Sequence, residues 1–310
     1  MKTLHELSQQ FARKQPHQVD ALTEEAPIMK RIPFDAASHA MWNNYEEVVD
    51  VQGAGFVEMN APLPVVDAAT KLTKVDLGIL GGEIECPEDT AQMFGGKEKY
   101  FAKKIDKVLR KSGQTAEQRI IYDNFLRYAL DKGKAIDAGG TSGGSYSLVA
   151  VRFVKGETCG LYSPEGFKQG TMLDVQPIAG GTLYKASGGT YQGVLVYGLR
   201  LKAYLGIQIA NPNTVGAIVN IQKGKKPTEA MVDDLIAMVR GSSNGNTLLF
   251  CHERCKNLLN HQYKGNSLQV GTKDKDIDRT FTHWNGIEIV TSYNFNDGTD
   301  AVVTGLPAYA

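Results

Sequence analysis

The stretch KEKYFAKKIDKVLRKSGQTAEQRIIYDNFLRYALDK, residues 97–132, carries the strongest periodic signal in the chain. Its apolar side chains recur at helical spacing in two groups: Phe101, Ile105, Val108 and Leu109, and then Ile121, Phe125, Tyr128 and Ala129. Apolar residues at i, i+4, i+7 and i+8 form one face of an α-helix that packs on a core. The sequence therefore predicts a long helix over residues 97–132.

Ser112 and Gly113 interrupt the two apolar groups. Thr115 and Gln118 stand at the spacing of a capping box. In this motif a Thr side chain caps the start of a helix, and the Gln side chain three residues later accepts a hydrogen bond from the backbone amide of the Thr. These residues predict that the chain restarts a helix there, and they leave the continuity of the long helix open.

The first half of this helix is strongly basic, because seven Lys and Arg side chains face only Glu98 and Asp106. Lys103, Lys104 and Lys107 are the candidate contact face for an anionic partner. A charge run on a helix is more often a solvated face, and that alternative stays open.

The residues before the helix, 41–85, predict a long β-hairpin. Two extended segments, WNNYEEVVDVQGAGFVEMN (42–60) and TKLTKVDLGILGGEIEC (70–86), flank a proline-marked turn, APLPVVDAA (61–69). Their alternation of apolar and polar residues is imperfect and rich in glycine. A hairpin with such weak internal support is marginal alone, so we expect it to need a partner surface.

The N-terminal residues predict a short helix and then an extended segment. Leu4, Leu7 and Phe11 stand at helical spacing. The next residues, up to Pro33, are interrupted by Pro16 and Pro27, which is typical of an extended arm.

After the helix, a glycine-rich joint, DAGGTSGGS (137–145), leads into a mainly β part. Strands are expected in SLVAVRFV, ETCGLYS, TMLDV, YQGVLVYGLRLKAYLGIQIA and TVGAIVNI. Residues 227–241 predict a helix with Thr228 as N-cap and Gly241 past its end. NTLLF (246–250) predicts a strand, and Asn285-Gly286 predicts a tight hairpin turn. The elements together indicate the α+β class.

Composition limits the function classes. The 310 residues contain 34 Lys and Arg against 34 Asp and Glu, so the chain lacks the excess positive charge of a protein that coats nucleic acid. The 42% hydrophobic content suffices for a packed core. No apolar run reaches the length of a signal peptide or a membrane helix, so we expect no membrane contact. Four scattered cysteines do not form a disulfide framework, which favours synthesis in a reducing cytoplasm.

CHERC, residues 251–255, is the motif that most suggests a metal site or a reactive thiol. Read as a helix, Cys251, Cys255, Leu258 and Leu259 fall on one apolar face, while His252 and Arg254 point elsewhere. A structural zinc site needs a second pair of ligands, which does not follow, and His261 lies on another face. Core packing of both sulfurs is the favoured interpretation; a metal site and a reactive thiol are the alternatives.

No other motif predicts catalysis, a cofactor or a metal. AGGTSGGS (138–145) lacks the Gly-Lys-Ser/Thr ending of a phosphate-binding loop, and GAGF (53–56) is an incomplete dinucleotide fingerprint. The six histidines form no local cluster with carboxylates, and no G-x-S-x-G motif occurs. We therefore expect no enzyme and no cofactor.

Several segments, taken in order, resemble one known family. They are APIMKRIPF (26–34), LGILGGEIEC (77–86), YSLVAVRF (146–153), CGLYSPEGFKQGTMLDV (159–175), GLRLKAYLGIQIANPNTVGAIVNI (198–221), NTLLFCHERCKNLL (246–259) and WNGIEIVTSYNF (284–295). The chain resembles the tailed-bacteriophage major capsid proteins with the Hong-Kong-97 fold, in particular the group found in many short-tailed phages. The resemblance spans residues 22–303, although Ser163 precedes Pro164 where the family more often has Tyr-Pro directly.

The resemblance implies a division of the chain into the parts of that fold. Residues 1–40 resemble its N-terminal arm, and residues 41–80 resemble its extended loop, which lies over a neighbouring subunit. Residues 81–144 and 176–212 resemble its peripheral domain, with the spine helix at 97–132. Residues 145–175 and 213–310 resemble its axial domain. The loop tip, Pro62, Leu63, Pro64 and Val65, is then the candidate inter-subunit contact.

The resemblance also implies the function: hexamers and pentamers of this chain close an icosahedral shell around double-stranded DNA in the virion. The expected partners are other copies of the chain, a separate scaffolding protein, a portal, a decoration protein and the packaged DNA. Some relatives crosslink a loop lysine, and Lys71 and Lys74 lie in that loop. Two alternatives stay open: an encapsulin-like compartment shell, and a soluble α/β enzyme that uses a cysteine thiol.

Overall fold

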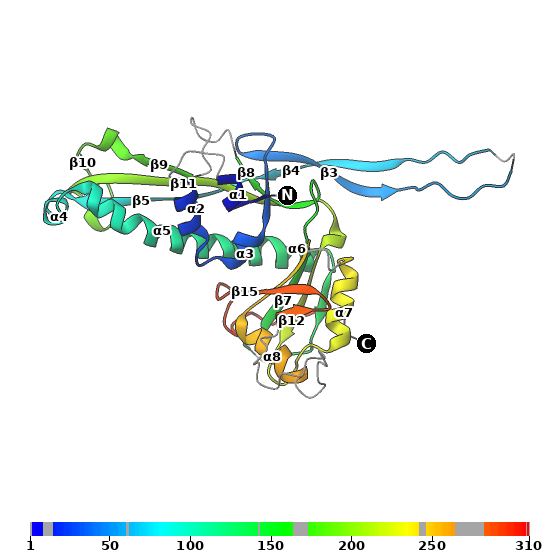
Figure 1. The fold of residues 1–310 in the computed structure, drawn as a ribbon. Helices are drawn as coiled ribbons and strands as arrows, with labels where there is room; N and C mark the ends of the chain where they lie inside the picture. The colour runs from blue at the N-terminus through cyan, green and yellow to red at the C-terminus, as the bar shows by residue number, and fades with distance from the viewer. Residues whose placement is uncertain are drawn as a thin grey trace, which may run out of the picture.

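The apolar stripes of residues 97–132 form one continuous helical rod in the computed structural model (Figure 1). The structure describes residues 2–8, 15–59, 62–141, 143–163, 173–241, 246–263, 282–307 and 309. The rod consists of α5 (Lys97–Arg119), a π-helical segment η1 (Ile120–Leu126) and α6 (Arg127–Asp131). Leu109, Ile121, Phe125 and Ala129 are buried, as their spacing predicts.

The predicted restart of the helix near Ser112-Gly113 is wrong. The hydroxyl of Ser112 donates to the carbonyl oxygen of Val108, and that of Thr115 donates to Lys111, one turn earlier in each case. Hydroxyls that bond back in this way are compatible with a helix interior, so Thr115 is no N-cap. The spine is therefore unbroken at these residues.

A seven-stranded sheet lies along the spine, with the long strand β11 (Leu195–Ile209) at its centre. On one side β11 pairs antiparallel with β5 (Gly78–Pro87), from Val196 opposite Pro87 to Leu205 opposite Gly78. On the other side it pairs with β8 (Thr158–Tyr162), β9 (Leu173–Pro177) and β10 (Tyr184–Lys185). Beyond β8 follow β2 (Pro33–Ala36) and β1 (Lys2–Thr3). We call this sheet and the spine, with the short helix α4 (Glu88–Met93), the long body.

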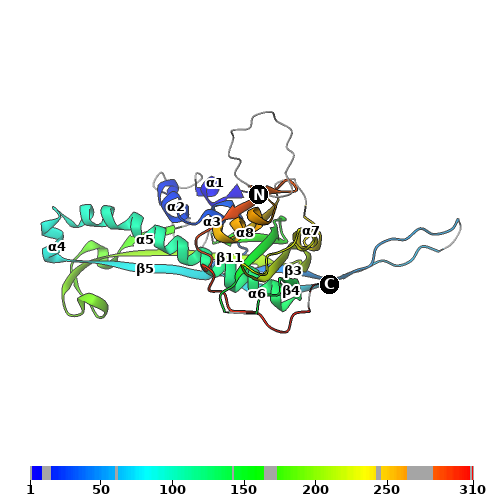
Figure 2. The same ribbon diagram turned by 90° about the horizontal axis from the view of Figure 1, so that it is seen from below.

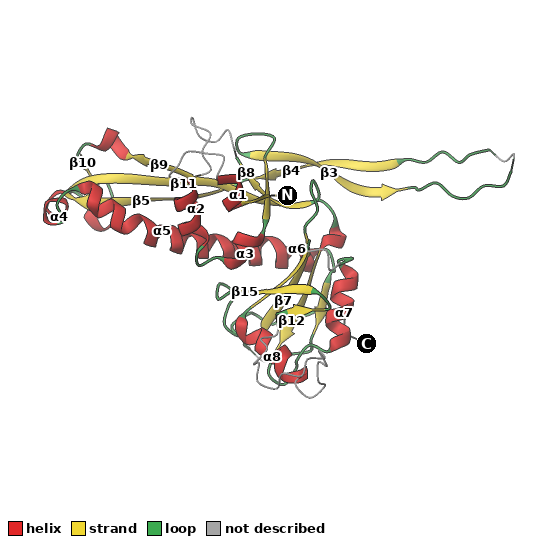
Figure 3. Cartoon of the chain, in the orientation of Figure 1, coloured by secondary structure: helices red, strands yellow, loops and turns green. Residues whose placement is uncertain are grey.

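The predicted hairpin is confirmed. Strands β3 (Trp42–Val51) and β4 (Ala68–Asp76) pair antiparallel from Trp42 opposite Asp76 to Val51 opposite Ala68. Figure 3 shows that the projection continues beyond both strands as extended chain away from the body. The return strand of the hairpin is β4, whereas the second half of the predicted return segment, LGILGGEIEC (77–86), lies largely in β5 and pairs with β11 in the long body.

The N-terminal region is helical, so the predicted extended arm is wrong. After α1 (Leu4–Ser8), where Leu4 and Leu7 are buried as expected, come α2 (Gln15–Thr23) and α3 (Pro27–Arg31). Figures 1 and 2 both place α2 and α3 beside α5, and α2 packs directly on it. Phe11 lies outside the described residues.

A six-stranded sheet forms a separate lower lobe beneath the end of the spine (Figure 1). Its strands, in spatial order, are β14 (His283–Trp284), β15 (Ile287–Thr291), β13 (Thr247–Cys251), β7 (Tyr146–Arg152), β12 (Val215–Ile221) and β6 (Ala135–Asp137). The helices α7 (Glu229–Met238) and α8 (Glu253–Tyr263) flank it. Within the described ranges, the remaining elements are the short 3₁₀ turns η2 (Ile178–Gly181), η3 (Gly189–Tyr191) and η4 (Pro212–Thr214).

Local signals in the lower lobe are confirmed. The Thr228 hydroxyl accepts a hydrogen bond from the Met231 amide and caps α7. Asn285 and Gly286 have positive φ angles of 46° and 82° and join β14 to β15, as the Asn-Gly signal predicts.

The pairing of strands alters the expected division of the chain. Because β8 and β9 pair with β11, the described residues of 158–175 belong to the long body and not with residues 213–310. Conversely, β6 pairs with β12, so residues 135–137 belong to the lower lobe and not to the long body. The turn at Pro164 lies outside the described residues.

The strand β7 links the two parts through opposite faces. Its Val149 and Val151 join the core that includes Phe125 of the spine, while Leu148 and Ala150 join a second core beneath α7 and α8. Side chains of successive strand residues point to opposite faces, so a strand that is buried throughout must be covered on both. The lower lobe thus packs one face of its sheet against the long body.

Candidate assembly surfaces

The end of the hairpin is apolar and exposed to solvent. Leu63 is 79% exposed and Val65 is 91% exposed, and Pro62 and Pro64 are exposed beside them. Across the turn, Phe56 and Met59 are also almost fully exposed, and the sequence reasoning did not include them. An exposed apolar cluster at the end of a projection is typical of a surface that another molecule covers.

The base of the hairpin is fixed to the long body. The Asn43 side-chain amide donates to Gln208 over 2.6 Å in a buried hydrogen bond, and Asn43 accepts from the amide of Ser38. Farther along β3, Glu47 lies 3.4 Å from the ammonium of Lys132 at the end of the spine. A buried hydrogen bond at the base holds the direction of the projection.

The loop lysines differ in their surroundings. Lys74 forms a 2.8 Å ion pair with Asp76, and its ammonium lies 5.4 Å from the ring centre of Trp42. Lys71 is exposed and lies opposite Glu47 in the hairpin register.

The candidate anionic-partner face lies on the first half of α5. Lys103, Lys104 and Lys107 are all exposed, and none of them forms an ion pair with another described residue. Lys103 lies 5.5 Å from the ring centre of Phe94, and Lys104 lies 5.7 Å from that of Tyr100. Other charges on the helix are used differently, because Arg110 pairs with Glu24 at 2.7 Å.

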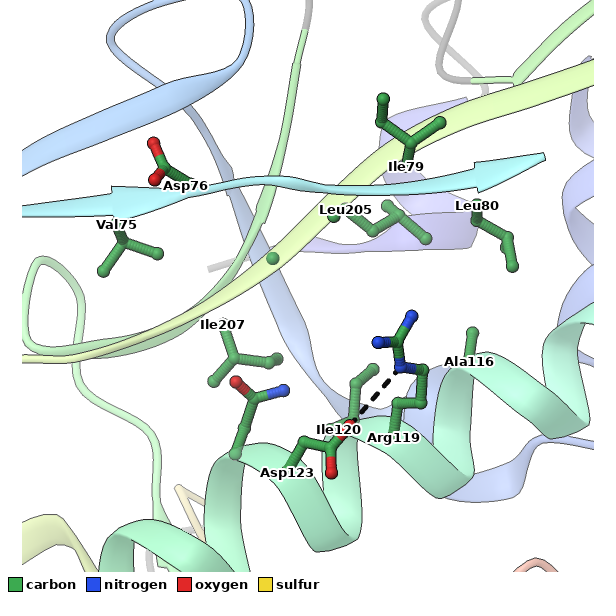
Figure 4. Close-up of a pocket in the computed structure, with 13 residues that line it drawn as sticks. Val75, Asp76, Ile79, Leu80, Ala116, Arg119, Ile120, Asp123, Leu205 and Ile207 are labelled. Atoms are coloured by element: carbon green, nitrogen blue, oxygen red, sulfur yellow. Dashed lines mark hydrogen bonds and ion pairs between the residues drawn. The ribbon is translucent and has the colours of Figure 1, made fainter.

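A groove opens between the base of the hairpin and the spine, with a volume of about 280 Å³ (Figure 4). Val75, Leu80 and Ile207 point into it from the strands above, and Ala116 and Ile120 lie on the helix below. At its mouth Arg119 and Asp123 form an exposed ion pair of 3.4 Å. Both charges are exposed, and the rest of the groove is lined mainly by apolar side chains.

Both cysteines of CHERC are buried free thiols in the core of the lower lobe. Cys251 ends strand β13 instead of beginning the helix, and Cys255 lies in α8; both are fully buried with Leu259, as the core interpretation predicts. A hydrogen bond with Cys251 and burial hold the pKa of Cys255 well above its usual value. Within the described ranges, no three His, Cys, Asp or Glu side chains gather to hold a metal ion.

His252 is buried and does not point away from the core, contrary to its expected orientation. Its ring lies near those of Tyr146 and Tyr293, and its Nδ1 accepts a hydrogen bond of 3.1 Å from the amide of Arg254. Burial lowers the pKa of His252, which favours the neutral ring. The side chain of His261 lies outside the described residues.

The buried thiols predict slow chemical labelling. We expect Cys86, Cys159, Cys251 and Cys255 to react with Ellman's reagent roughly 100-fold more slowly in the native protein than in guanidinium chloride, because a buried thiol reacts only when the fold opens. The absorbance of the released thionitrobenzoate measures both rates. One thiol that reacts fully within the first phase at neutral pH would revive the thiol-enzyme alternative.

The two glycine-rich motifs do not precede helices. GAGF (53–56) lies on the exposed projection, and the joint at 138–145 leads from β6 into strand β7. Neither places backbone amides at a helix N-terminus, where phosphate groups bind.

Among the described residues, no helix is long and apolar enough to cross a membrane.

Comparisons with known proteins agree on one family. A family model described as "Major capsid protein GP7" matches residues 12–303. A comparison with curated proteins gives no match. The chain is similar to a chain of bacteriophage Epsilon15, with 14% identity and a TM-score of 0.55 over 86% of this chain and 87% of that chain.

Other solved structures are also similar. The bacteriophage JBD30 capsid has 10% identity and a TM-score of 0.51 over 86% of this chain and 89% of that chain. An encapsulin complex from Synechococcus elongatus has 10% identity and a TM-score of 0.44 over 62% of this chain and 85% of that chain. The similarity to the Epsilon15 and JBD30 chains confirms the α+β capsid fold of the Hong-Kong-97 type. Since the family model spans nearly the whole chain, this chain belongs to the family of the major capsid protein GP7.

Proposed function

We propose that this chain assembles with copies of itself as hexamers and pentamers, which close an icosahedral shell around double-stranded DNA. The observation that carries the proposal is the projecting hairpin of a capsid-family chain, fixed at its base and bare and apolar at its tip. A large apolar surface that its own chain does not cover is expected to be buried by another subunit.

In this proposal the parts of the molecule keep the roles of the capsid fold. The N-terminal helices α1, α2 and α3 act as the N-terminal arm, and the hairpin of β3 and β4 acts as the extended loop. The long body serves as the peripheral domain, and the lower lobe serves as the axial domain, which gathers around five-fold and six-fold centres. The tip at Pro62, Leu63, Pro64 and Val65 lies on a neighbouring subunit and adds to an obligate interface, which often exceeds about 2,000 Å² in total.

The charge of the chain suits close packing of many copies. With 34 basic and 34 acidic residues, adjacent subunits experience little net repulsion. The basic face of α5 supplies a local positive surface on an otherwise neutral wall. We therefore propose that Lys103, Lys104 and Lys107 face the packaged DNA.

Reversing the charge of this face tests that role. We expect Lys103→Glu, Lys104→Glu and Lys107→Glu together to leave shell formation intact and to lower the DNA content of purified particles by about tenfold, because each lost phosphate contact weakens binding. The same reversal at Lys223, Lys225 and Lys226, in the turn after β12, is the matched control. Equal DNA content in both variants would remove the DNA role from α5.

The remaining partners follow from the same proposal. A separate scaffolding protein directs assembly, a portal occupies one vertex, and a decoration protein binds the outer surface. The chain is made in the host cytoplasm and acts in the virion. In this proposal the chain is a structural subunit of the shell. It carries out no catalysis, needs no cofactor and binds no membrane.

Negative-stain electron microscopy and sedimentation of the same purified sample test the main proposal. Closed shells, or rings of five and six subunits, are the expected result. A stable monomer or dimer across salt and protein concentrations, also in the presence of the phage's scaffolding protein, would contradict it.

A further inference from the structure

Glu117 is a fully buried carboxylate on the spine helix. Its Oε2 accepts a hydrogen bond of 2.9 Å from the amide of Met29, and the amide of Ile28 also donates to this carboxylate. Its Oε1 accepts from the hydroxyl of Ser292 and, at 2.9 Å, from the side-chain amide of Asn294. Four donors therefore converge on one acidic group.

These donors come from two segments at opposite ends of the chain. Ile28 and Met29 belong to α3 in the N-terminal region, whereas Ser292 and Asn294 follow β15 of the lower lobe. Glu117 stands between them, one turn beyond Gly113, which faces α2. Three separate segments thus meet at a single side chain.

The carboxylate needs both pairs of donors. Burial raises the pKa of Glu117, and the hydrogen bonds that it accepts oppose that rise. A buried charge is tolerated only when hydrogen bonds replace the water that it has lost. If one segment moved away, Glu117 would lose half of its donors, and the free energy of the state in which only the other segment stays docked would rise.

We propose that Glu117 couples two packing events: the docking of the N-terminal helices on the spine, and the docking of the lower-lobe segment 288–296. Each depends on the other through this side chain, which we call the shared latch. Release of either segment promotes release of the other. Linkage of this kind is reciprocal, so it can be approached from either side.

Two nearby contacts also connect the N-terminal segment with the lower-lobe segment, and they limit which variant can test the proposal. Asn294 donates to the carbonyl oxygen of Glu25 over 2.9 Å, and Arg31 pairs with Glu288 at 2.7 Å. Both bridge the two segments directly, without Glu117. Ser292 is different, because its hydroxyl donates to Glu117 and accepts only from the amide of Asn294 within its own segment.

Ser292→Ala is therefore the sharp variant. We expect hydrogen–deuterium exchange to rise about tenfold in residues 17–31, to which the structure shows no hydrogen bond from the Ser292 hydroxyl, as well as in residues 288–296. Glu117→Gln should have the same pattern with a larger effect, since its amide places a donor against two of the four donors. Mass spectrometry of peptic peptides from the full-length protein measures both segments.

Ser147→Ala is the matched control. Ser147 donates to the carboxylate of Asp300 over 2.7 Å in another buried Ser–carboxylate hydrogen bond of the lower lobe, and this hydroxyl is not among the donors to Glu117. We expect this variant to leave exchange in residues 17–31 unchanged.

Three results would overturn the latch. One is faster exchange in residues 288–296 of the Ser292 variant with residues 17–31 unchanged. Another is no change in either segment. The third is a rise in residues 17–31 that the Ser147 control matches, which would indicate general destabilisation. If Glu117→Gln does not fold, the Ser292 variant still decides.

Discussion

Leu63→Asp combined with Val65→Asp is expected to abolish shell formation and to leave the fold of the subunit intact. Leu63 is 79% exposed and Val65 is 91% exposed on the projecting hairpin, so the change removes little contact within the chain. Substitutions at such positions usually change stability by no more than about 0.5 kcal/mol. Any large effect must then arise between subunits.

The size of that effect follows from burial at the proposed interface. Covering a Leu or Val side chain contributes about 1.5–3 kcal/mol each, and an aspartate at the same place must also lose its water. Two such losses weaken each contact by more than about a hundredfold, because 1.4 kcal/mol corresponds to a factor of ten. Every subunit of a shell repeats the loss, so closed particles should disappear from sedimentation profiles and micrographs.

Leu63→Met combined with Val65→Ile is the control for this prediction. It keeps the tip apolar and of similar size, and shells should form as they do with the unchanged protein. Circular dichroism of both variants checks that the subunits fold. Normal shells from the aspartate variant would show that the tip lies outside the interface.

Those parts of the fold with a local physical cause could be predicted from the sequence. The apolar faces of residues 97–132 required a helix, and Thr228 and Asn285-Gly286 marked a helix start and a turn through their own backbone geometry. The hairpin could be predicted because its two extended segments flank one proline-marked turn. In each case the neighbours in sequence decide the conformation.

The N-terminal region shows how a correct local signal can be misread. Pro16 and Pro27 favour an extended arm when read alone, but they stand at the first turns of α2 and α3. Proline favours the first turn of a helix, where its missing N–H is not needed. What decides between the two states is packing against α5, a contact that the N-terminal sequence alone does not contain.

Features that depend on distant partners could not be predicted. The strands at 158–162 and 173–177 were recognised, but their pairing with β11 depends on how the chain returns in space. At the candidate surfaces, the exposed tip residues followed from the hairpin, whereas the groove beside Ile120 needed three segments to be brought together. The burial of Glu117 could not be predicted, because an acidic residue on a basic helix is ordinarily a surface residue.

Gly113→Ala is expected to detach the N-terminal helices from the spine. A methyl group at this position would collide with the carbonyl oxygen of Leu22 at the end of α2 and would lie 3.0 Å from its carbonyl carbon. Both are backbone atoms, so no side-chain rotation relieves the contact, and α2 must move. Crowding of this kind costs about 1–3 kcal/mol, against a gain of up to about 1 kcal/mol from replacing glycine by alanine within a helix.

The two opposing terms make this prediction decisive. If α2 packs on Gly113 as the structure has it, the variant should unfold at lower urea concentration, and trypsin should cleave residues 15–31 faster. Ser112→Ala, at the neighbouring position, loses only a hydroxyl that bonds within its own helix and should change stability by less than about 0.5 kcal/mol. If α2 does not pack there, only the helix propensity of alanine remains, and the Gly113 variant becomes more stable than the unchanged protein. The sign of the change therefore distinguishes a glycine selected for close helix packing from a glycine that merely weakens the spine.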